Sequence, residues 1–248
     1  MTHDDIEPLR ARSLKDEFIE RFEALILSGR FTPGQRVPSE RELGTLFGVS
    51  RPVVHEGLRA LEGRGLVTIE SRRGVRVNDY RREGSIEMLL SILNYTSGRL
   101  SPELMNGILE MRLLFEAETA RLAATRRTKE HLSALRDVLR REQAMVRPSV
   151  ADVSLVDYDF HLAVAIASGN QIYPLLLNSF KRIYRTILEQ FYTDPAVIRP
   201  VFEYHAALVG EIAAGREDGA RDAMLDILRF GESNLRRIMG DQRPELRD

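Results

Sequence analysis

An aspartate and two histidines in the second half of the sequence have the types and spacing of metal ligands. Asp157 and His161 are four residues apart within a segment of helical periodicity, so their side chains face the same way. A carboxylate and an imidazole placed in this way suit shared coordination of a divalent metal, and His205, two predicted helices further on, could complete a convergent set. A hydrogen-bonded aspartate–histidine pair without a metal is the alternative, and by itself the spacing is more typical of that pair.

A second set of polar residues lies in the first third of the sequence, on a helix predicted over 50–64. Arg51, His55 and Arg59 are spaced four residues apart and share one face of this helix. The apolar residues of a different face are Val54, Leu58 and Leu61. A helix in the major groove reads base edges with side chains near its N-terminus, and the arginine fork matches guanine O6 and N7. We therefore expect DNA contacts from this face, with a solvated helix face as the alternative; the residues are Ser50, Arg51, His55 and Arg59.

Further arginines flank this helix. Arg41 lies in the first turn of the preceding predicted helix, where it could reach the same groove or a phosphate, or pair with a neighbouring glutamate. Arg72, Arg73 and Gly74 form the tip of a predicted hairpin, where arginines can lie against phosphates or enter the minor groove; a plain solvated turn is the alternative. The net charge is −1, but residues 30–82 carry eleven arginines against six acidic residues. Such an excess is expected of a phosphate-binding module, and a solvated surface of mixed charge is the alternative.

The elements that must position these arginines follow from caps and periodicity. Three helices begin at serine caps and end at glycines, over 13–29, 39–48 and 50–65. The apolar period then changes from helical to two, which predicts a hairpin over 67–77. Helix, helix, tight turn, helix and hairpin is the order of a winged helix-turn-helix, and we assign it to residues 1–78.

The remainder of the chain shows helical periodicity only, so the predicted fold class is mainly α. We place a linker at 79–85, an all-α bundle that can hold an internal cavity at 86–240, and a tail at 241–248. The helices predicted in this part are 86–97, 102–125, 128–145, 151–168, 171–192, 195–214 and 216–239.

The first part of the chain resembles the DNA-binding domain of the GntR family of bacterial regulators. The matching pieces are PSEREL at a helix start, GVSRPVV at the turn and ALEGRGLV before the wing, and the resemblance covers about residues 12–78. It implies operator contacts from Arg41, Ser50, Arg51 and the wing around 72–74. Similar proteins usually carry arginine where this chain has His55, so the resemblance does not define the base read there.

The second part resembles the effector-binding domain of the FadR-like branch of that family, called FCD, over about 86–240. The resemblance is carried by RLLFEAETARLAA, DYDFHLAVAIASGN and EYHAALVGEIAAGREDGARDAM. In many such domains an aspartate and three histidines hold a divalent metal, zinc or similar, beside a small carboxylate effector. Asp157, His161 and His205 match three of these positions, and the third histidine would fall near Ile227 and is missing. Either three ligands and a water or effector carboxylate hold the metal, or the effector meets the histidines without one.

Two further residues belong to the expected effector site. Arg112 matches an effector-domain arginine that can pair with a carboxylate, and an intrahelical pair with Glu116 is an equal alternative. Asn170 is expected to cap the turn after Gly169 and to have a secondary role in the pocket.

These observations predict a ligand-responsive transcription regulator, a repressor, which binds a pseudo-palindromic operator as a homodimer in the cytoplasm, at the nucleoid. The sequence has no cysteine, no apolar run of about 20 residues and no signal-peptide core, so we expect no disulfide, no cysteine nucleophile and no membrane partner. A metal-dependent enzyme using Asp157, His161 and His205 is one alternative, although no nucleophile elbow, glycine-rich phosphate loop or HExxH motif is present. A dimeric DNA-binding adaptor without an effector is the other.

Overall fold

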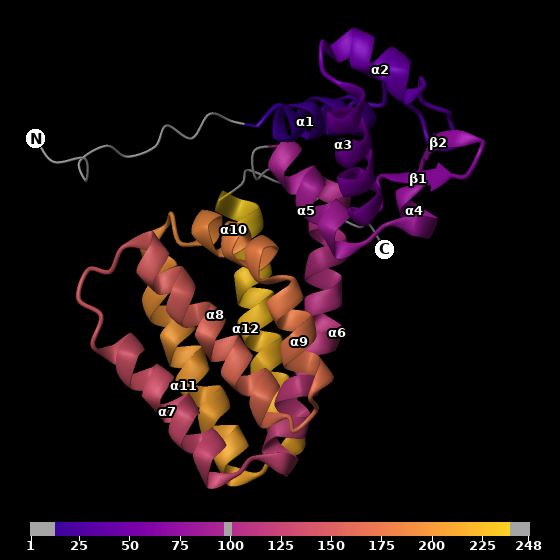
Figure 1. The fold of residues 1–248 in the computed structure, drawn as a ribbon. Coiled ribbons are helices and arrows are strands. Elements are labelled where there is room, and N and C mark those ends of the chain that lie inside the picture. The colour runs from indigo at the N-terminus through magenta and orange to yellow at the C-terminus, as the bar shows by residue number, and fades with distance from the viewer. Residues whose placement is uncertain (1–12, 97–100, 239–248) are drawn as a thin grey trace, which may run out of the picture. The chain divides into compact units, whose positions relative to one another are not determined.

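The structure is a computed structural model that describes residues 13–96 and 101–238 (Figure 1). The predicted tail at 241–248 and the first twelve residues lie outside the described part. The chain divides into two compact units, Met1–Arg99 and Leu100–Asp248. The described residues are mainly helical, as predicted.

The N-terminal unit is a winged helix-turn-helix, in the predicted order of elements. Its elements are α1 (Leu14–Leu27), α2 (Glu40–Phe47), α3 (Arg51–Gly63), β1 (Val67–Glu70), β2 (Gly74–Val77), α4 (Tyr80–Glu83) and α5 (Ile86–Tyr95). The two strands pair antiparallel, with Val67 opposite Val77 and Glu70 opposite Gly74. Their apolar residues join the side chains of α1, α2 and α3 in one core, which includes Phe18, Phe22, Leu43, Val54, Leu58, Leu61 and Val75.

Caps and one close helix contact hold this unit together. Ser39 and Glu42 form a reciprocal capping box at the start of α2, and Gly48 ends that helix in the left-handed conformation with φ of 66°. Gly57 lies where α3 crosses α1: a Cβ atom at this position would lie 2.3 Å from Cδ1 of Phe18. Only glycine therefore allows the two helices to approach this closely.

The segment after the wing differs from the expected linker. Helix α4 occupies residues 80–83, and its Glu83 accepts a hydrogen bond from Arg76 of β2 at 3.0 Å. Helix α5 belongs to the N-terminal unit, because Met88 is buried in the core of that unit and α5 contacts α1. The boundary between the two units therefore follows α5, at residue 99, rather than preceding it.

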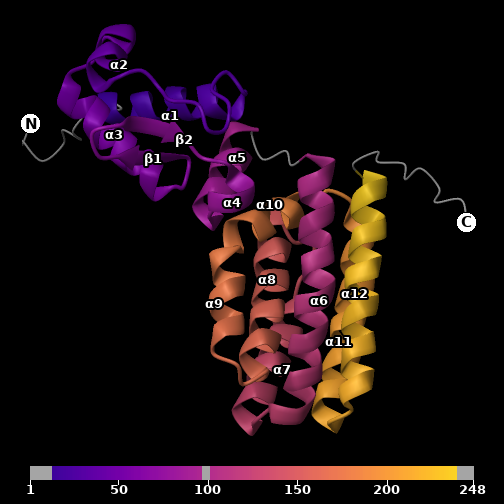
Figure 2. The same cartoon turned by 90° about the vertical axis from the view of Figure 1, so that its right-hand side faces the viewer.

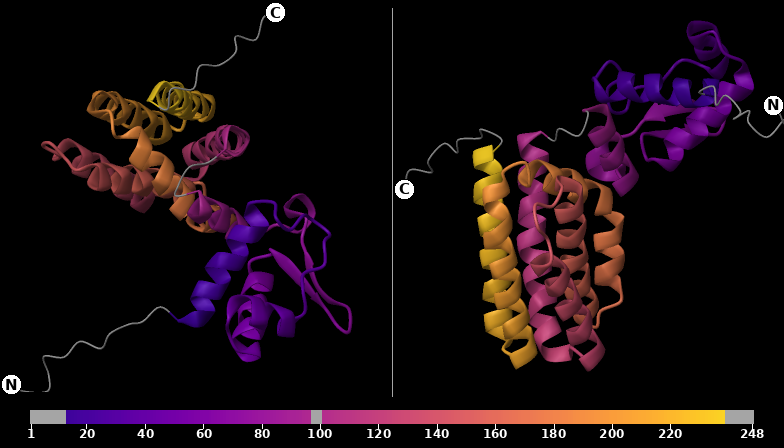
Figure 3. Two further views of the ribbon diagram at one scale, coloured as in Figure 1. Left: turned by 90° about the horizontal axis from the view of Figure 1, so that it is seen from above. Right: turned by 90° about the vertical axis from the view of Figure 1, so that its left-hand side faces the viewer.

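The C-terminal unit is an all-α bundle, as predicted (Figures 2 and 3). Its elements are α6 (Pro102–Arg126), α7 (Lys129–Gln143), α8 (Val150–Ala167), α9 (Ile172–Ser179), α10 (Lys181–Phe191), the short η2 (Pro195–Val197), α11 (Ile198–Ala214) and α12 (Glu217–Ile238). The long helix α6 packs against α12, α8 and α11, and Figure 2 shows α6 and α12 side by side.

The single helix predicted over 171–192 is wrong, because the chain breaks at Phe180 into α9 and α10. Phe180 has φ of −90° and ψ of 0°, which is not helical. The break allows the apolar face of α10, with Ile183, Tyr184 and Ile187, to turn into the bundle, whereas α9 leaves Ile172 and Leu175 exposed. Among the described helices, none is both long and apolar enough to cross a membrane.

Candidate functional site

The exposed face of α3 carries the residues predicted to read DNA. Arg51, His55 and Arg59 are exposed, whereas Val54, Leu58 and Leu61 are completely buried. Arg59 donates to Glu62 at 3.0 Å, three residues further on, and so makes an intrahelical ion pair. DNA contact by this face stays a prediction.

Arg51 and His55 share a partner on the preceding helix that spacing within α3 does not reveal. Glu40 accepts a hydrogen bond from Nε of Arg51 at 2.9 Å through Oε2, and its Oε1 lies 2.7 Å from Nδ1 of His55. These contacts with His55 and Arg51 lower the pKa of Glu40. Glu40 is eleven and fifteen residues from its partners, so only the crossing of α2 and α3 brings the three side chains together.

The other predicted DNA contacts are also exposed. Arg41 lies in the first turn of α2, and Ser50 precedes α3 without making a side-chain capping hydrogen bond. At the wing tip, Arg72 and Gly74 have positive φ values of 62° and 91°, which turn the chain sharply between the strands. Arg73 is exposed beside them, and its backbone N–H donates to the carbonyl of Glu70 at 3.0 Å.

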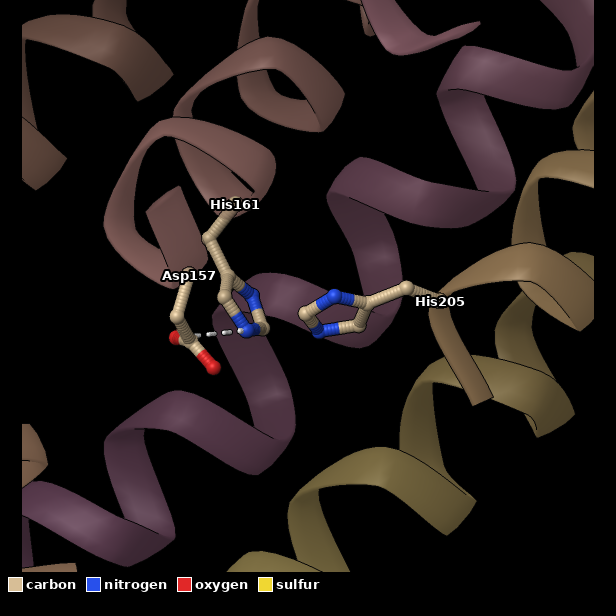
Figure 4. A group of neighbouring side chains, drawn as sticks. All are labelled: Asp157, His161 and His205. Carbon is tan, nitrogen blue, oxygen red and sulfur yellow. Dashed lines mark ion pairs between the residues drawn. The ribbon is translucent and has the colours of Figure 1, made fainter. Parts of the chain in front are cut away.

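In the bundle, Asp157 and His161 of α8 meet His205 of α11 (Figure 4). The three side chains are buried, and one ligand atom from each lies within 4.8 Å of the others. Oδ1 of Asp157 and Nε2 of His205 are buried without a hydrogen-bond partner among the described residues. The proximity expected from the sequence is therefore present, and the three groups face one another.

Two buried glutamates hold the outer nitrogens of the histidines. Nδ1 of His161 contacts Oε2 of Glu116 of α6, and Nδ1 of His205 lies 2.6 Å from Oε1 of Glu142 of α7. Nε2 of His161 lies 3.7 Å from Oδ1 of Asp157. Spacing along the chain indicated Glu116 only as a partner of Arg112 and did not indicate Glu142, because these contacts join four different helices.

Burial shifts the pKa values of this cluster in opposite directions. Burial raises the pKa of Glu142 to about 9, with a further contribution from the charge of Asp157. Burial lowers the pKa of His205 to about 3. Burial alone would also raise the pKa of Glu116, but Arg112 and His161 outweigh it and bring the value to about 2. At neutral pH, His205 and Glu142 are therefore neutral, whereas Glu116 is ionised.

Arg112 lines the cavity beside this cluster, but its charge is already paired. Its Nε donates to Oε1 of Glu116 at 2.6 Å, and its Nη2 donates to the hydroxyl of Tyr184. The intrahelical alternative for Arg112 is thus present in the structure. Asn170 caps the start of α9 by accepting from the N–H of Ile172 at 2.9 Å, and it does not line the cavity, which differs from the expected secondary role.

The cavity measures about 30 Å³ and is mostly apolar. Arg112, Asp157 and His161 are its polar lining, and Ile227 lies among the apolar side chains around them. Space of this size accommodates a few water-sized groups and no metabolite.

Comparison with known proteins agrees with both halves of this description. Residues 14–77 match the model of the bacterial regulatory proteins of the gntR family, and residues 107–230 match the FCD domain. The HTH-type transcriptional regulator Mce2R of Mycobacterium tuberculosis is 30% identical over 237 residues, which cover 96% of this chain and 98% of that protein. The putative L-lactate dehydrogenase operon regulatory protein of Escherichia coli is 31% identical over 244 residues, which cover 93% of this chain and 90% of that protein.

A solved structure shows the same fold. Lar, which controls the expression of the Listeria monocytogenes agr system, has a TM-score of 0.58 at 13% identity and matches 92% of this chain and 99% of its own. The chain therefore belongs to the GntR family of bacterial regulatory proteins, in the FadR-like branch with an FCD domain, and it is a DNA-binding transcription regulator rather than an enzyme.

Proposed function

We propose that this regulator is a ligand-controlled repressor whose bundle binds a divalent metal through Asp157, His161 and His205. The convergence of their three ligand atoms, buried within 4.8 Å of one another, carries the proposal. A homodimer would place two copies of α3 and the wing on a pseudo-palindromic operator, because two-fold protein symmetry requires a two-fold site. Such a protein acts in the cytoplasm, at the nucleoid.

The residues of the cluster fit a metal ion. Two imidazole nitrogens and a carboxylate oxygen are a common donor set for zinc at a site with an open position. Oδ1 of Asp157 and Nε2 of His205 are buried polar atoms without a hydrogen-bond partner among the described residues, and a cation would satisfy both. A carboxyl group at the outer nitrogen of each histidine is the usual support of a metal-binding imidazole, because it orients the ring.

The fourth coordination position would be left to water or to the effector. Ile227 lines the cavity at the place where a further histidine would fall, and it offers no donor atom. A small carboxylate could therefore bind the metal directly. The pairing of Arg112 supports binding of the effector carboxylate by the metal rather than by this arginine. The charge of the Arg112 guanidinium is already balanced by the carboxylate of Glu116.

Effector binding would also change the shape of the bundle. The cavity of about 30 Å³ is lined by helices α6, α8, α10, α11 and α12, and it is too small for a metabolite. A ligand larger than this cavity therefore requires the lining helices to move apart. Such a ligand binds the opened bundle more tightly than the closed one and therefore shifts the equilibrium toward the opened bundle. If the two forms of the bundle also differ in affinity for the operator, ligand binding changes operator affinity by the same coupling free energy.

The metal is tested with protein purified without a histidine tag and stripped with a chelator. Zinc added at about 100 times its dissociation constant stabilises a folded site by about 2.7 kcal/mol, which raises the Tm of a unit of this size by about 5–11 °C. Asp157→Ala should lose this shift. Glu203→Ala is the matched control, because Glu203 lies on α11 with 72% of its side chain exposed, in an ion pair with Arg199. Metal-free protein whose Tm does not respond to zinc, nickel or manganese contradicts the proposal.

Ligand control and operator binding need a second experiment. A gel shift on the chain's own promoter region should show binding that weakens steeply with salt, and Arg51→Ala should abolish discrimination for the operator while the fold and dimer stay intact. Metal-loaded protein is then screened by thermal shift against sugar acids, amino acids, dicarboxylates and acyl compounds. Response to none of them favours the effector-less adaptor.

A further inference from the structure

The exposed N-terminal end of α3 is organised by a carboxylate that is itself held by the scaffold. Glu40 is 25% exposed, whereas the side chains of Arg51 and His55 are 76% and 51% exposed. Glu40 occupies the first position of α2, directly after the N-cap Ser39 and within the capping box that Ser39 forms with Glu42. One carboxylate on a capped helix therefore restricts both of the longer, more exposed side chains.

This contact defines which nitrogen of His55 carries hydrogen. An ionised carboxylate only accepts hydrogen bonds. Oε1 of Glu40 lies 2.7 Å from Nδ1 of His55, so Nδ1 is the donor. The lowered pKa of Glu40 agrees with a carboxylate that stays ionised. In the neutral ring, Nε2 then has no hydrogen, and the nitrogen left for a ligand is an acceptor.

We propose that Glu40 makes His55 a reader of amino groups, so that the base which His55 contacts presents its amino group, adenine N6 or cytosine N4, to the ring. The inference rests on the proposed function, in which α3 lies in the major groove. The donors that base edges offer in that groove are these two amino groups, whereas guanine and the oxygen of thymine present acceptors. An arginine at the same position would be donor-only and would select guanine instead.

The same carboxylate limits how Arg51 can meet a base. Its Nε is engaged by Oε2 of Glu40, which leaves the two terminal nitrogens as the free end of the guanidinium. Two terminal N–H groups match guanine O6 and N7 end-on. With Glu40 in place, Arg51 offers two hydrogen-bond donors and His55 offers one acceptor. Arg51 should therefore select a base edge with acceptors, and His55 a base edge with a donor.

The inference is tested by operator affinity and by the tautomer of the ring. Fluorescence anisotropy is measured at about pH 8.5, above the ordinary titration range of imidazole, with every base pair of one half-site replaced in turn. His55→Ala identifies the contacted position as the one where discrimination disappears. Replacing the adenine or cytosine of that pair by an analogue without the amino group should weaken wild-type binding by about 3–10-fold, the size of one hydrogen bond, and this ratio is the preference at the His55 position. In His55→Arg the ratio should fall to about one, and a G·C pair should be favoured.

The variant Glu40→Gln, compared with a second variant that removes the same charge, tests whether Glu40 acts through its hydrogen bond to His55 or only through its negative charge. Glutamine offers one acceptor and one donor, so it no longer imposes a hydrogen on Nδ1, and the preference at the His55 position should fall at least threefold. Glu56→Gln is the matched control, because it removes the same charge from the residue next to His55 and should leave the preference unchanged; Glu56 lies 4.0 Å from Lys15 instead. Circular dichroism checks that each variant is folded.

Long-range ¹H–¹⁵N spectra of the free protein give a readout that does not depend on DNA. The His55 signals, assigned with His55→Gln, should show hydrogen on Nδ1 in the wild type and a mixture of tautomers in Glu40→Gln. Hydrogen on Nε2 in the wild type, or wild-type binding that is unchanged when the amino group of the contacted base is deleted, overturns the inference while operator binding stands. Absence of any operator binding by the wild type overturns the proposed function as well.

Discussion

Replacing Gly57 with alanine should loosen the recognition helix from its scaffold. The added Cβ would lie 2.3 Å from Cδ1 and 2.7 Å from Cε1 of Phe18. The Phe18 ring is 2% exposed and packs between Phe22 and Phe47, with ring centroids 5.6 Å and 5.0 Å away. It cannot swing away, so α3 must separate from α1.

The magnitude follows from the overlap. Overpacking a filled core costs about 1–3 kcal/mol, and the higher helix propensity of alanine offsets about 1 kcal/mol of it. We expect a net loss of up to about 2 kcal/mol, which lowers the Tm of a unit of about 100 residues by up to about 16 °C. Operator affinity should fall too, because the helix that carries Arg51 and His55 is displaced.

The same substitution at Gly63 of α3 is the control. A Cβ at Gly63 meets no atom within 4 Å, so alanine there should stabilise the helix by about 0.5–1 kcal/mol. The chain has no tryptophan, and hydrogen exchange of the α1 and α3 amides therefore reports on this unit better than fluorescence. If Gly57→Ala protects these amides as well as Gly63→Ala does, the packing argument is wrong.

Three further predictions concern the wing and the bundle. Replacing both Arg72 and Arg73 with alanine removes four arginines from the dimer, so binding should weaken about equally for all DNA sequences and the slope of log K against log salt should fall by about 4; an unchanged slope would show that the wing tip does not contact phosphates. His161→Ala should spare operator binding by the ligand-free protein but blunt its response to the effector, and an intact response would place the ligand elsewhere. Burial raises the pKa of Glu142 from 4.5 to about 9, so the folded state keeps a proton that the unfolded chain releases, and its contribution to stability is lost as pH rises through this window. Glu142→Gln stays neutral throughout, and in urea unfolding of metal-free protein its stability relative to the wild type should therefore increase from pH 5 to pH 9; a constant difference would contradict the assignment.

Local signals in the sequence predicted most elements because helix caps, glycine stops and apolar periods act over a few residues. Ser39 with Glu42 predicted the start of α2, and the change of period after Gly65 predicted the wing. The break at Phe180 was missed because it depends on where α10 packs in the bundle, and no glycine or proline stands at that position. The place of α5 in the N-terminal unit likewise depends on the burial of Met88.

The sequence by itself determined the winged helix-turn-helix, the face of α3 that is exposed, and the common orientation of Asp157 and His161, since each depends on spacing within one element. The tertiary structure decided which partners those side chains have. Glu40 meets Arg51 and His55, and Glu142 meets His205, only because separate helices cross. The physical reason is that hydrogen bonds and burial depend on distance in space, and residues eleven to sixty-three positions apart carry no periodic signal of their contact.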